Sequence, residues 1–402
     1  MDPLLTHAEN PLQQHYQRFQ VDQRILLSGH SHQAWPDVAW EGQMQAYADA
    51  ASLVDDKWDA AFGQADLVRQ HLGRLLNVAP EKLVLGASTH DLLIRFLSAL
   101  PIGEKRVLLT TSGEFHSMRR QLRRLGESGF TIQVIPVDPL ESLAERMIQE
   151  LNSQTLAVMM SAVFFQDGRV FEEVAGVVRA ATEQSIASLV DCYHAINVLP
   201  FDAQQDGLSS AFLLGGGYKY LQAGEGNCFM ALPDHHHPGW NSRPIVTGWF
   251  AEFGLLDQAT HNVPYGPDHQ AFAGSTYDPV SHYRANRVFQ FFVEQQLTPA
   301  RLADINRQQQ AWLLQGLREL KLSPQILDLF SLPSTQRGGF LALPSPCAER
   351  WVQLLRTKKV YCDSRNGYLR LGPAPYVSQL QIQKAIEIIG QVAKELSGDR
   401  RI

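Results

Sequence analysis

An aspartate and a lysine, each near the end of an apolar run, carry the clearest chemical signal in this sequence. Asp191 closes the run SLVD, and Lys219 follows the next run, AFLLGGGY. An enzyme that uses pyridoxal phosphate needs such a pair, because its lysine forms a Schiff base with the cofactor aldehyde and its carboxylate keeps the pyridine nitrogen protonated. Glycines beside the lysine would let it approach a cofactor closely. The pair therefore predicts a pyridoxal phosphate site.

Each of these residues also has an ordinary structural explanation. A buried aspartate at the end of a strand often caps a helix or forms a turn, and lysines in glycine-rich loops are commonly solvated. His194, three residues after Asp191, is on spacing alone best interpreted as a hydrogen-bonded core histidine. The position of Asp191 and Lys219 at the ends of consecutive apolar runs is what favours catalysis.

The elements that must position this pair are short apolar runs that alternate with helical patterns between residues 82 and 232. The runs cover residues 105–111, 131–137, 155–162, 188–191, 211–214 and 228–232. Continuous apolar strands that alternate with helices predict a mostly parallel sheet covered on both faces. Ligands of such sheets bind at the carboxyl ends of the strands, so Asp191 and Lys219 would lie at one edge.

Three parts of the chain differ in pattern. Residues 1–40 form an irregular arm, whose segment GHSHQAWPD is too rich in polar and turn residues for a strand interior. Residues 41–280 form a large α/β domain. Residues 281–402 hold a linker helix and a smaller α+β domain, with strand patterns GGFLAL and GYLRL before a final helix.

Composition excludes several classes of protein. The chain has 402 residues, 45% of them hydrophobic, which is enough for a large core and two domains. Its net charge of −6 is spread along the sequence, so no basic surface indicates nucleic acid, and no apolar run is long enough to span a bilayer. The N-terminus lacks the features of a secretory signal, and the four cysteines form no CxxC pair.

We expect a cytoplasmic protein with reduced cysteines. We expect no metal, because the run His235-His236-His237 before a proline is typical of an exposed turn.

Two segments carry a specific resemblance to a known family. DCYHAINVLPFD and GGGYKYLQAGEG resemble the cofactor core of kynureninase and its relatives in the class V aminotransferase group, which have the type I fold of pyridoxal phosphate enzymes. The resemblance implies a mostly parallel, seven-stranded sheet in the large domain. It implies that Asp191 lies on the pyridine nitrogen, that His194 lies near the ring and that Lys219 holds the cofactor. Tyr218 takes the place of a tyrosine that contacts the phosphate and assists proton transfer.

Further segments follow in the order of the family, and each implies a cofactor contact. GASTHDLL resembles the phosphate loop, where Ser88 and Thr89 at a helix N-terminus would make an anion site, although an ordinary N-cap explains them equally well. SGEFHSM implies that Phe115 stacks on the pyridine ring; a core phenylalanine is the alternative. TGWF and FAGST imply that Trp249 and Thr276 reach the phosphate of a partner subunit, hence a homodimer with shared sites.

The C-terminal segment VYCDSRNGYLRLGPAPY also resembles kynureninase, and it implies that Arg370 binds the substrate carboxylate. The planar guanidinium fits a carboxylate with two parallel hydrogen bonds. The alternative is a surface arginine on an alternating strand. In the N-terminal arm, the family pattern G-N-S-L-G is replaced by GHSHQ, and we expect His30 on the substrate side. Kynureninases carry a serine-asparagine pair whose asparagine contacts the aromatic substrate ring. The FAGST segment replaces this pair here, so substrate specificity stays open.

The resulting hypothesis is a hydrolase that cleaves the Cβ–Cγ bond of kynurenine or a related amino acid and releases alanine and an acid. A cysteine desulfurase needs a persulfide cysteine on a mobile loop, and neither Cys347 nor Cys362 is a convincing candidate. A C–S lyase and a class V aminotransferase remain alternatives. A catalytically silent binding protein with this fold is the non-enzymatic alternative, against which the retention of Asp191 and Lys219 argues.

Overall fold

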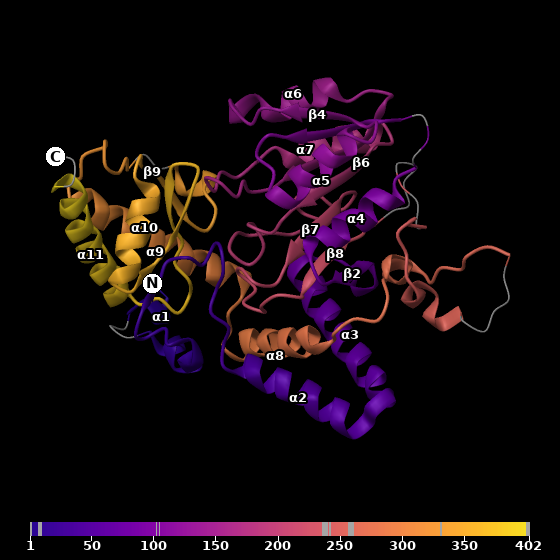
Figure 1. The fold of residues 1–402 in the computed structure, drawn as a ribbon, viewed down its shortest axis with the longest axis horizontal. Coiled ribbons are helices and arrows are strands. Elements are labelled where there is room, and N and C mark those ends of the chain that lie inside the picture. The colour runs from indigo at the N-terminus through magenta and orange to yellow at the C-terminus, as the bar shows by residue number, and fades with distance from the viewer. Residues whose placement is uncertain are drawn as a thin grey trace.

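A seven-stranded sheet forms the centre of the molecule (Figure 1). The computed structural model describes residues 2–6, 10–101, 103, 105–234, 240, 243–255, 261–329 and 332–398. The strand order is β2-β8-β7-β6-β5-β3-β4. The strands are β2 (Leu83–Gly86), β3 (Val107–Thr111), β4 (Thr131–Ile135), β5 (Thr155–Ser161), β6 (Ala187–Asp191), β7 (Phe212–Gly216) and β8 (Cys228–Ala231). Strands β3 to β7 are parallel, whereas β8 is antiparallel to both neighbours. The predicted α/β sheet is confirmed, and the edge strand β2, absent from the predicted runs, completes it.

Helices cover both faces of this sheet because neighbouring strand residues point to opposite sides. On β5, Val158 and Met160 pack with helices α3, α6 and α7, whereas Ala157 and Met159 pack with α4 and α5. Every residue of β5 is buried, as expected for a central parallel strand. The helices of the chain are α1 (Pro3–Thr6), α2 (Val38–Leu53), α3 (Lys57–Leu76), α4 (Thr89–Ala99), α5 (His116–Gly126), α6 (Leu143–Glu150), α7 (Val174–Glu183), α8 (Val280–Glu294), α9 (Pro299–Glu319), α10 (Ala348–Thr357) and α11 (Gln379–Gly398).

A smaller antiparallel sheet follows in the C-terminal part. Its order is β11-β12-β9, formed by β11 (Asp363–Arg365), β12 (Tyr368–Leu371) and β9 (Leu341–Pro344). Apolar residues of this sheet share one core with α9, α10 and α11. The N-terminal arm packs on the same core (Figure 1). Its strand β1 (Ile25–Leu26) pairs in parallel with β10 (Val360–Tyr361), so the arm runs alongside the chain that leads into β11.

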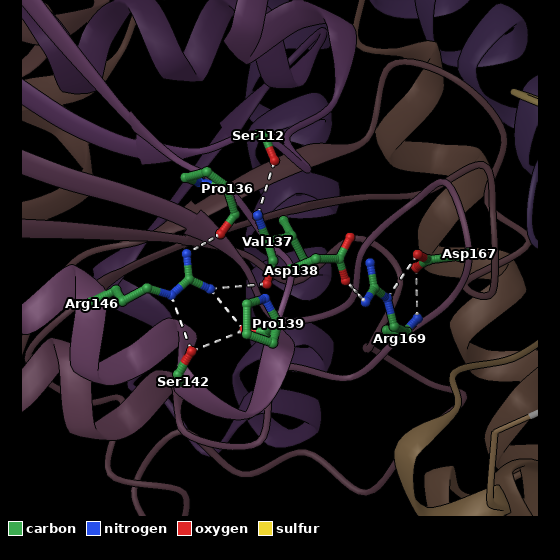
Figure 2. A network of polar contacts seen from close by, with 9 residues as sticks. All are labelled: Ser112, Pro136, Val137, Asp138, Pro139, Ser142, Arg146, Asp167 and Arg169. Atoms are coloured by element: carbon green, nitrogen blue, oxygen red, sulfur yellow. Dashed lines mark hydrogen bonds and ion pairs between the residues drawn. The ribbon is translucent and has the colours of Figure 1, made fainter.

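Two arginines fix the loops that follow β4 and β5 (Figure 2). Arg146 donates to the backbone carbonyls of Pro136, Val137 and Pro139. Arg169 donates to Asp167 at 2.8 Å and to Asp138. Since Arg169 lies in a narrow hairpin closed by the Val163–Val170 bridge, these bonds tie the hairpin to the loop after β4. This hairpin, residues 163–170, also pairs with residue 337 next to the small sheet.

Within the described ranges, no helix combines the length and the apolar character needed to cross a membrane. In the same part of the chain, no three His, Cys, Asp or Glu side chains gather in a way that could hold a metal ion. His235, His236 and His237 lie outside the described residues.

Candidate active site

A small cavity lies at the carboxyl ends of β5 and β6. Six of the predicted site residues line it, from four separate segments of the sequence. The lining residues are Thr89, Phe115, Ser161, Val163, Phe165, Asp191, Tyr193, His194, Tyr218 and Lys219. The parallel sheet therefore brings the predicted aspartate and lysine to the same edge, as expected for this class of sheet.

Lys219 reaches the cavity from the loop after β7, and the glycines before it make room for aromatic rings. A Cβ atom on Gly215 would lie 2.5 Å from the ring of Phe229, and one on Gly216 would lie 2.5 Å from the ring of Tyr193. Any larger residue would displace these buried rings. The structure thus shows a packing reason for the glycine run, in addition to the close approach to a cofactor that the sequence suggested.

Burial makes Lys219 an unusually weak base. Its side chain is 6% exposed, and its Nζ atom lies 2.8 Å from Nε2 of His194 and 4.4 Å from the centre of the Tyr193 ring. Burial lowers the pKa of Lys219 to about 8, with a further lowering by Arg370, although the charge of Asp191 opposes this shift. Burial also lowers the pKa of His194 well below its usual value, so neutral His194 accepts a hydrogen bond from the lysine.

Asp191 ends strand β6 and turns its carboxylate toward the same cavity. Its Oδ1 atom accepts a hydrogen bond of 2.9 Å from the backbone N–H of Tyr193. Burial raises the pKa of Asp191, while this hydrogen bond and the charge of Lys219 lower it. A carboxylate in this setting gains stability from a cationic partner such as a protonated ring nitrogen.

Glu114 is a buried carboxyl group next to the cavity that the sequence analysis missed. It accepts hydrogen bonds from the hydroxyl of Thr111 at 2.5 Å, from the hydroxyl of Ser161 at 2.6 Å and from the Ser161 backbone at 3.2 Å. Burial, together with the charge of Asp191, raises the pKa of Glu114 to about 7, although its hydrogen bonds from Ser161 and Thr111 oppose this shift. Its position just after strand β3 was the available signal, since a carboxylate there reaches the ends of neighbouring parallel strands.

Ser88 and Thr89 lie at the N-terminus of α4, the predicted phosphate site. Ser88 is the N-cap, and its hydroxyl oxygen accepts from the backbone N–H of Asp91 at 3.1 Å. Thr89 lines the cavity. The N-cap interpretation of Ser88 therefore holds in the structure, and it leaves the positive end of the helix open to an anion.

Aromatic rings surround the lysine. Phe115, just before α5, has its ring centre 5.5 Å from Lys219 Nζ. The ring of Tyr218 stacks on the ring of His32 from the N-terminal arm, with centres 4.7 Å apart and planes 18° apart. Burial raises the pKa of the Tyr218 hydroxyl. Tyr193, which the sequence analysis did not select, packs between Gly216 and Lys219.

Trp249 and Thr276 do not line this cavity in the same chain. They contact each other instead, through a hydrogen bond of 3.3 Å from the indole N–H to the threonine hydroxyl. The Trp249 side chain is 41% exposed. This surface position keeps both residues accessible to a neighbouring molecule.

Arg370 and His30 form a second polar cluster, centred on Asp363. The guanidinium of Arg370 donates to both carboxylate oxygens of Asp363 and to the carbonyl oxygen of Phe165, a cavity residue. His30 is fully buried, and its Nε2 atom lies 2.8 Å from Oδ1 of Asp363. Arg370 is close enough to affect the pKa values of Lys219 and His194.

The residues around the cavity fit pyridoxal phosphate. The carboxylate of Asp191 could pair with the ring nitrogen, and the N-terminus of α4, with Ser88 and Thr89, could bind the phosphate. The buried Lys219 lies between aromatic rings. The Nδ1 atom of His194 is buried without a hydrogen-bond partner in the described chain, as expected where a polar ligand completes the site.

Comparison with known proteins agrees with this geometry. The family model described as aminotransferase class-V matches residues 41–322. An uncharacterised aminotransferase of Bacillus subtilis is 22% identical over 86% of this chain and 88% of its own length. A kynureninase of Xanthomonas oryzae pv. oryzae is 28% identical, but over only 46% of this chain and 45% of the relative.

Solved structures with the same fold include a complex of the cystine C–S lyase C-DES with its reaction product, cysteine persulfide. The TM-score is 0.78 at 16% identity, covering 92% of this chain and 98% of the other. At this identity the similarity shows the fold, which is that of type I pyridoxal phosphate enzymes.

Proposed function

We propose that this chain, which belongs to the aminotransferase class-V family, is a hydrolase of kynureninase type that cleaves an amino acid at its Cβ–Cγ bond. The protein is a pyridoxal phosphate enzyme of that family. When bound, this cofactor supplies an aldehyde that captures amines and a ring that takes up electrons. The observation that carries the proposal is the buried Arg370 beside the Lys219 cavity, since an arginine fork there selects a substrate with a carboxylate.

The side chains divide the chemical work between them. Lys219, with its pKa lowered to about 8, exchanges a proton near neutral pH and would hold the cofactor. Asp191 would keep the ring nitrogen protonated. Ser88 and Thr89 would bind the phosphate, and Phe115 would cover the ring. Water would add to the γ-carbonyl carbon of the substrate, which becomes the acid product when the Cβ–Cγ bond breaks. The Tyr218 hydroxyl, whose pKa is raised by burial, would donate a proton to Cβ.

Arg370 would bind the α-carboxylate of the substrate through its remaining N–H groups. A guanidinium has five N–H bonds. The Nε and Nη2 atoms face Asp363, and Nη1 donates to Phe165, so one N–H on each terminal nitrogen stays available. We propose that these two N–H groups hold the substrate carboxylate, since a guanidinium can bind a carboxylate with two parallel bonds.

A C–S lyase is the second candidate, and the cysteines favour it over a desulfurase. A persulfide-forming cysteine must be accessible and readily ionised. Cys192, Cys228 and Cys362 are buried, and burial raises the pKa of all three thiols. Cys347 is half-buried, with its Sγ atom 3.5 Å from the Ser345 hydroxyl. A C–S lyase needs no such cysteine, and C-DES shares the fold.

We also propose that the protein works as a homodimer with shared sites. Helix α2 exposes Trp40, Met44 and Tyr47 in one stripe, with exposed fractions of 48%, 46% and 73%. Residues at i, i+4 and i+7 lie on one face of a helix, and an exposed apolar face of this kind is typical of an interface. Trp249, at 41% exposure, and Thr276 would then reach the phosphate of the partner subunit.

Product analysis distinguishes the two candidate reactions. The purified, cofactor-loaded protein is incubated separately with L-kynurenine and with L-cystine. The kynureninase proposal predicts alanine and anthranilate from L-kynurenine, whereas pyruvate and a persulfide from L-cystine would establish the lyase instead. Alanine without any aromatic acid would contradict cleavage between Cβ and Cγ.

A further inference from the structure

The segment Gly29–Gln33 of the N-terminal arm contacts the cavity residue Tyr218 through the ring of His32, and it reaches Asp363 through His30. Parallel pairing of β1 with β10 places Ile25 opposite Val360 and Leu26 opposite Tyr361. The backbone of Gly29 then donates to the carbonyl of Gly372 at 2.8 Å. Because these two segments of the chain run side by side in this register, His30 lies next to Asp363.

We propose that His30 and Asp363 are positioning residues that hold the Arg370 guanidinium in the orientation needed for substrate binding. This inference rests on the proposed role of Arg370. Asp363 binds Nε and Nη2 of Arg370 with its two oxygens, and its Oδ1 atom is shared with His30 Nε2. The carboxylate therefore links the arm to the arginine, and one N–H on each terminal nitrogen of Arg370 remains for another carboxylate.

The protonation states of this cluster follow from its chemistry. A carboxylate only accepts hydrogen bonds, so the His30 Nε2 atom must carry a proton. Burial lowers the pKa of His30 to about 4, so the ring is neutral at physiological pH and donates through Nε2 alone. Burial opposes ionisation of Asp363, but hydrogen bonds from His30 and Arg370 hold its pKa below its usual range. The cluster thus consists of one anion, Asp363, which accepts hydrogen bonds from one cation, Arg370, and from one neutral donor, His30.

Packing fixes the His30 ring in place. It stacks on Phe340, with ring centres 4.4 Å apart and planes 26° apart. The guanidinium of Arg370 lies 5.5 Å from the same Phe340 ring, and a Cβ on Gly372 would lie 2.3 Å from His30 Nδ1. A Cβ atom on Gly168, in the hairpin held by Arg169, would lie 3.1 Å from the Phe340 ring. His30 therefore acts through Asp363, rather than by contact with substrate.

Binding of two matched probes to the cofactor-loaded enzyme tests this inference. L-Alanine carries a carboxylate and ethylamine is the same molecule without it, and the dissociation constant of each is measured from the change in cofactor absorption. We expect Asp363→Asn to weaken L-alanine binding about tenfold or more, since it loses the charge that fixes the arginine, and to change ethylamine binding less than twofold.

Asp2→Asn is the matched control. Asp2 binds Nε and Nη2 of Arg301 in the same two-pronged way, away from the cavity, so this variant should leave both dissociation constants unchanged. If Arg370→Lys weakens L-alanine binding and Asp363→Asn does not, the positioning role is wrong while the proposed role of Arg370 stands. If Arg370→Lys also has no effect, the proposed function of Arg370 fails first.

A pair of His30 variants keeps the inference testable even if Asp363→Asn does not fold. His30→Gln retains an N–H that can donate to Asp363, whereas His30→Leu has similar bulk and no donor. We expect the leucine variant to bind L-alanine several-fold more weakly than the glutamine variant, with ethylamine binding equal in both. Equal L-alanine binding by the two variants would overturn the role of His30.

Discussion

The cavity around Lys219 and the cluster around Asp363 are both buried, but they hold their charges in opposite ways. In the cavity, burial shifts the pKa values of Lys219 and His194 toward the neutral form of each group, and it does the same for Glu114 next to the cavity. Around Asp363, an ion pair with Arg370 keeps the charges in place and the pKa of the carboxyl low. A site that transfers protons needs groups whose pKa values lie near the working pH, whereas a site that binds an ion needs a group that stays charged. This difference supports the proposal that the first region carries out the chemistry and that the second binds the substrate carboxylate.

The largest expected effect is on the chemical region. Asp191→Asn keeps the shape of the side chain but removes the charge that would stabilise a protonated ring nitrogen. We expect kcat/KM to fall on the order of a thousandfold, about 4 kcal/mol in the transition state, while the cofactor still binds through Ser88 and Thr89. Steady-state kinetics and the cofactor content of the purified variant measure both quantities. Near-normal turnover would show that Asp191 does not face the ring nitrogen.

A second test uses the sign of the pH dependence of stability. Glu114 has a pKa of about 7 in the folded protein against 4.5 in its unfolded reference. Between these values the folded protein keeps a proton that the unfolded chain loses, so stability falls as pH rises, by up to about 3 kcal/mol. We expect the free energy of unfolding of Glu114→Gln, measured with urea across this pH range, to lack this decrease. If the free energy of unfolding changes with pH in the same way in the variant and the parent protein, Glu114 is ionised in the folded protein throughout this pH range.

Asp363 should show the opposite sign. Its pKa is held below the reference value of 3.8, so its contribution to stability is complete above that pH and is lost as pH falls below it. Asp363→Asn should therefore reduce stability at pH 7 and have a progressively smaller effect in acid. An effect that does not depend on pH would indicate that the charge of Asp363 contributes nothing to its pairing with Arg370.

On the recognition side, Arg370→Lys should raise KM and preserve the fold. An ammonium makes one point of contact where the guanidinium makes two, and we expect a loss of roughly 2–3 kcal/mol, about thirtyfold to hundredfold in KM for amino-acid substrates. Amines without a carboxylate should react as before. An unfolded Arg370→Lys protein, or an unchanged KM, would make Arg370 a structural residue.

The smallest of these effects concerns the proposed homodimer. A Lys219→Ala chain and a Trp249→Ala/Thr276→Ala chain should each be nearly inactive alone. In an equal mixture that exchanges subunits at random, half of the dimers are mixed and each holds one intact site, so about a quarter of the parent activity should return. No recovery after verified subunit exchange would show that these residues do not serve the partner site.

The sequence predicted the chemical region better than the recognition region. Six strands of the large sheet followed from continuous apolar runs, and parallel strands bring their ends to one edge, so Asp191, His194 and Lys219 were found together. The edge strand β2, with the residues LVLG, was absent from the predicted runs. Glu114 was missed because its partners, Thr111 and Ser161, come from two separate strands.

The contact between His30 and Asp363 joins residues 333 positions apart. It depends on how the arm pairs with β10, which no local pattern encodes. The sequence indicated Arg370 as a substrate-binding residue, which stays a prediction, but gave no indication that Asp363 occupies one side of its guanidinium. His30, expected on the substrate side, lies fully buried behind that pair. Packing between distant segments, rather than local pattern, decides these contacts.

The central claim is that Lys219 holds pyridoxal phosphate. The purified protein is reduced with borohydride, digested and analysed by mass spectrometry. The account predicts that one peptide, the one containing Lys219, gains the mass of a reduced phosphopyridoxyl group, and that the yellow colour of the protein disappears. A modified lysine elsewhere, or a protein that stays colourless and unmodified after incubation with the cofactor, would contradict it.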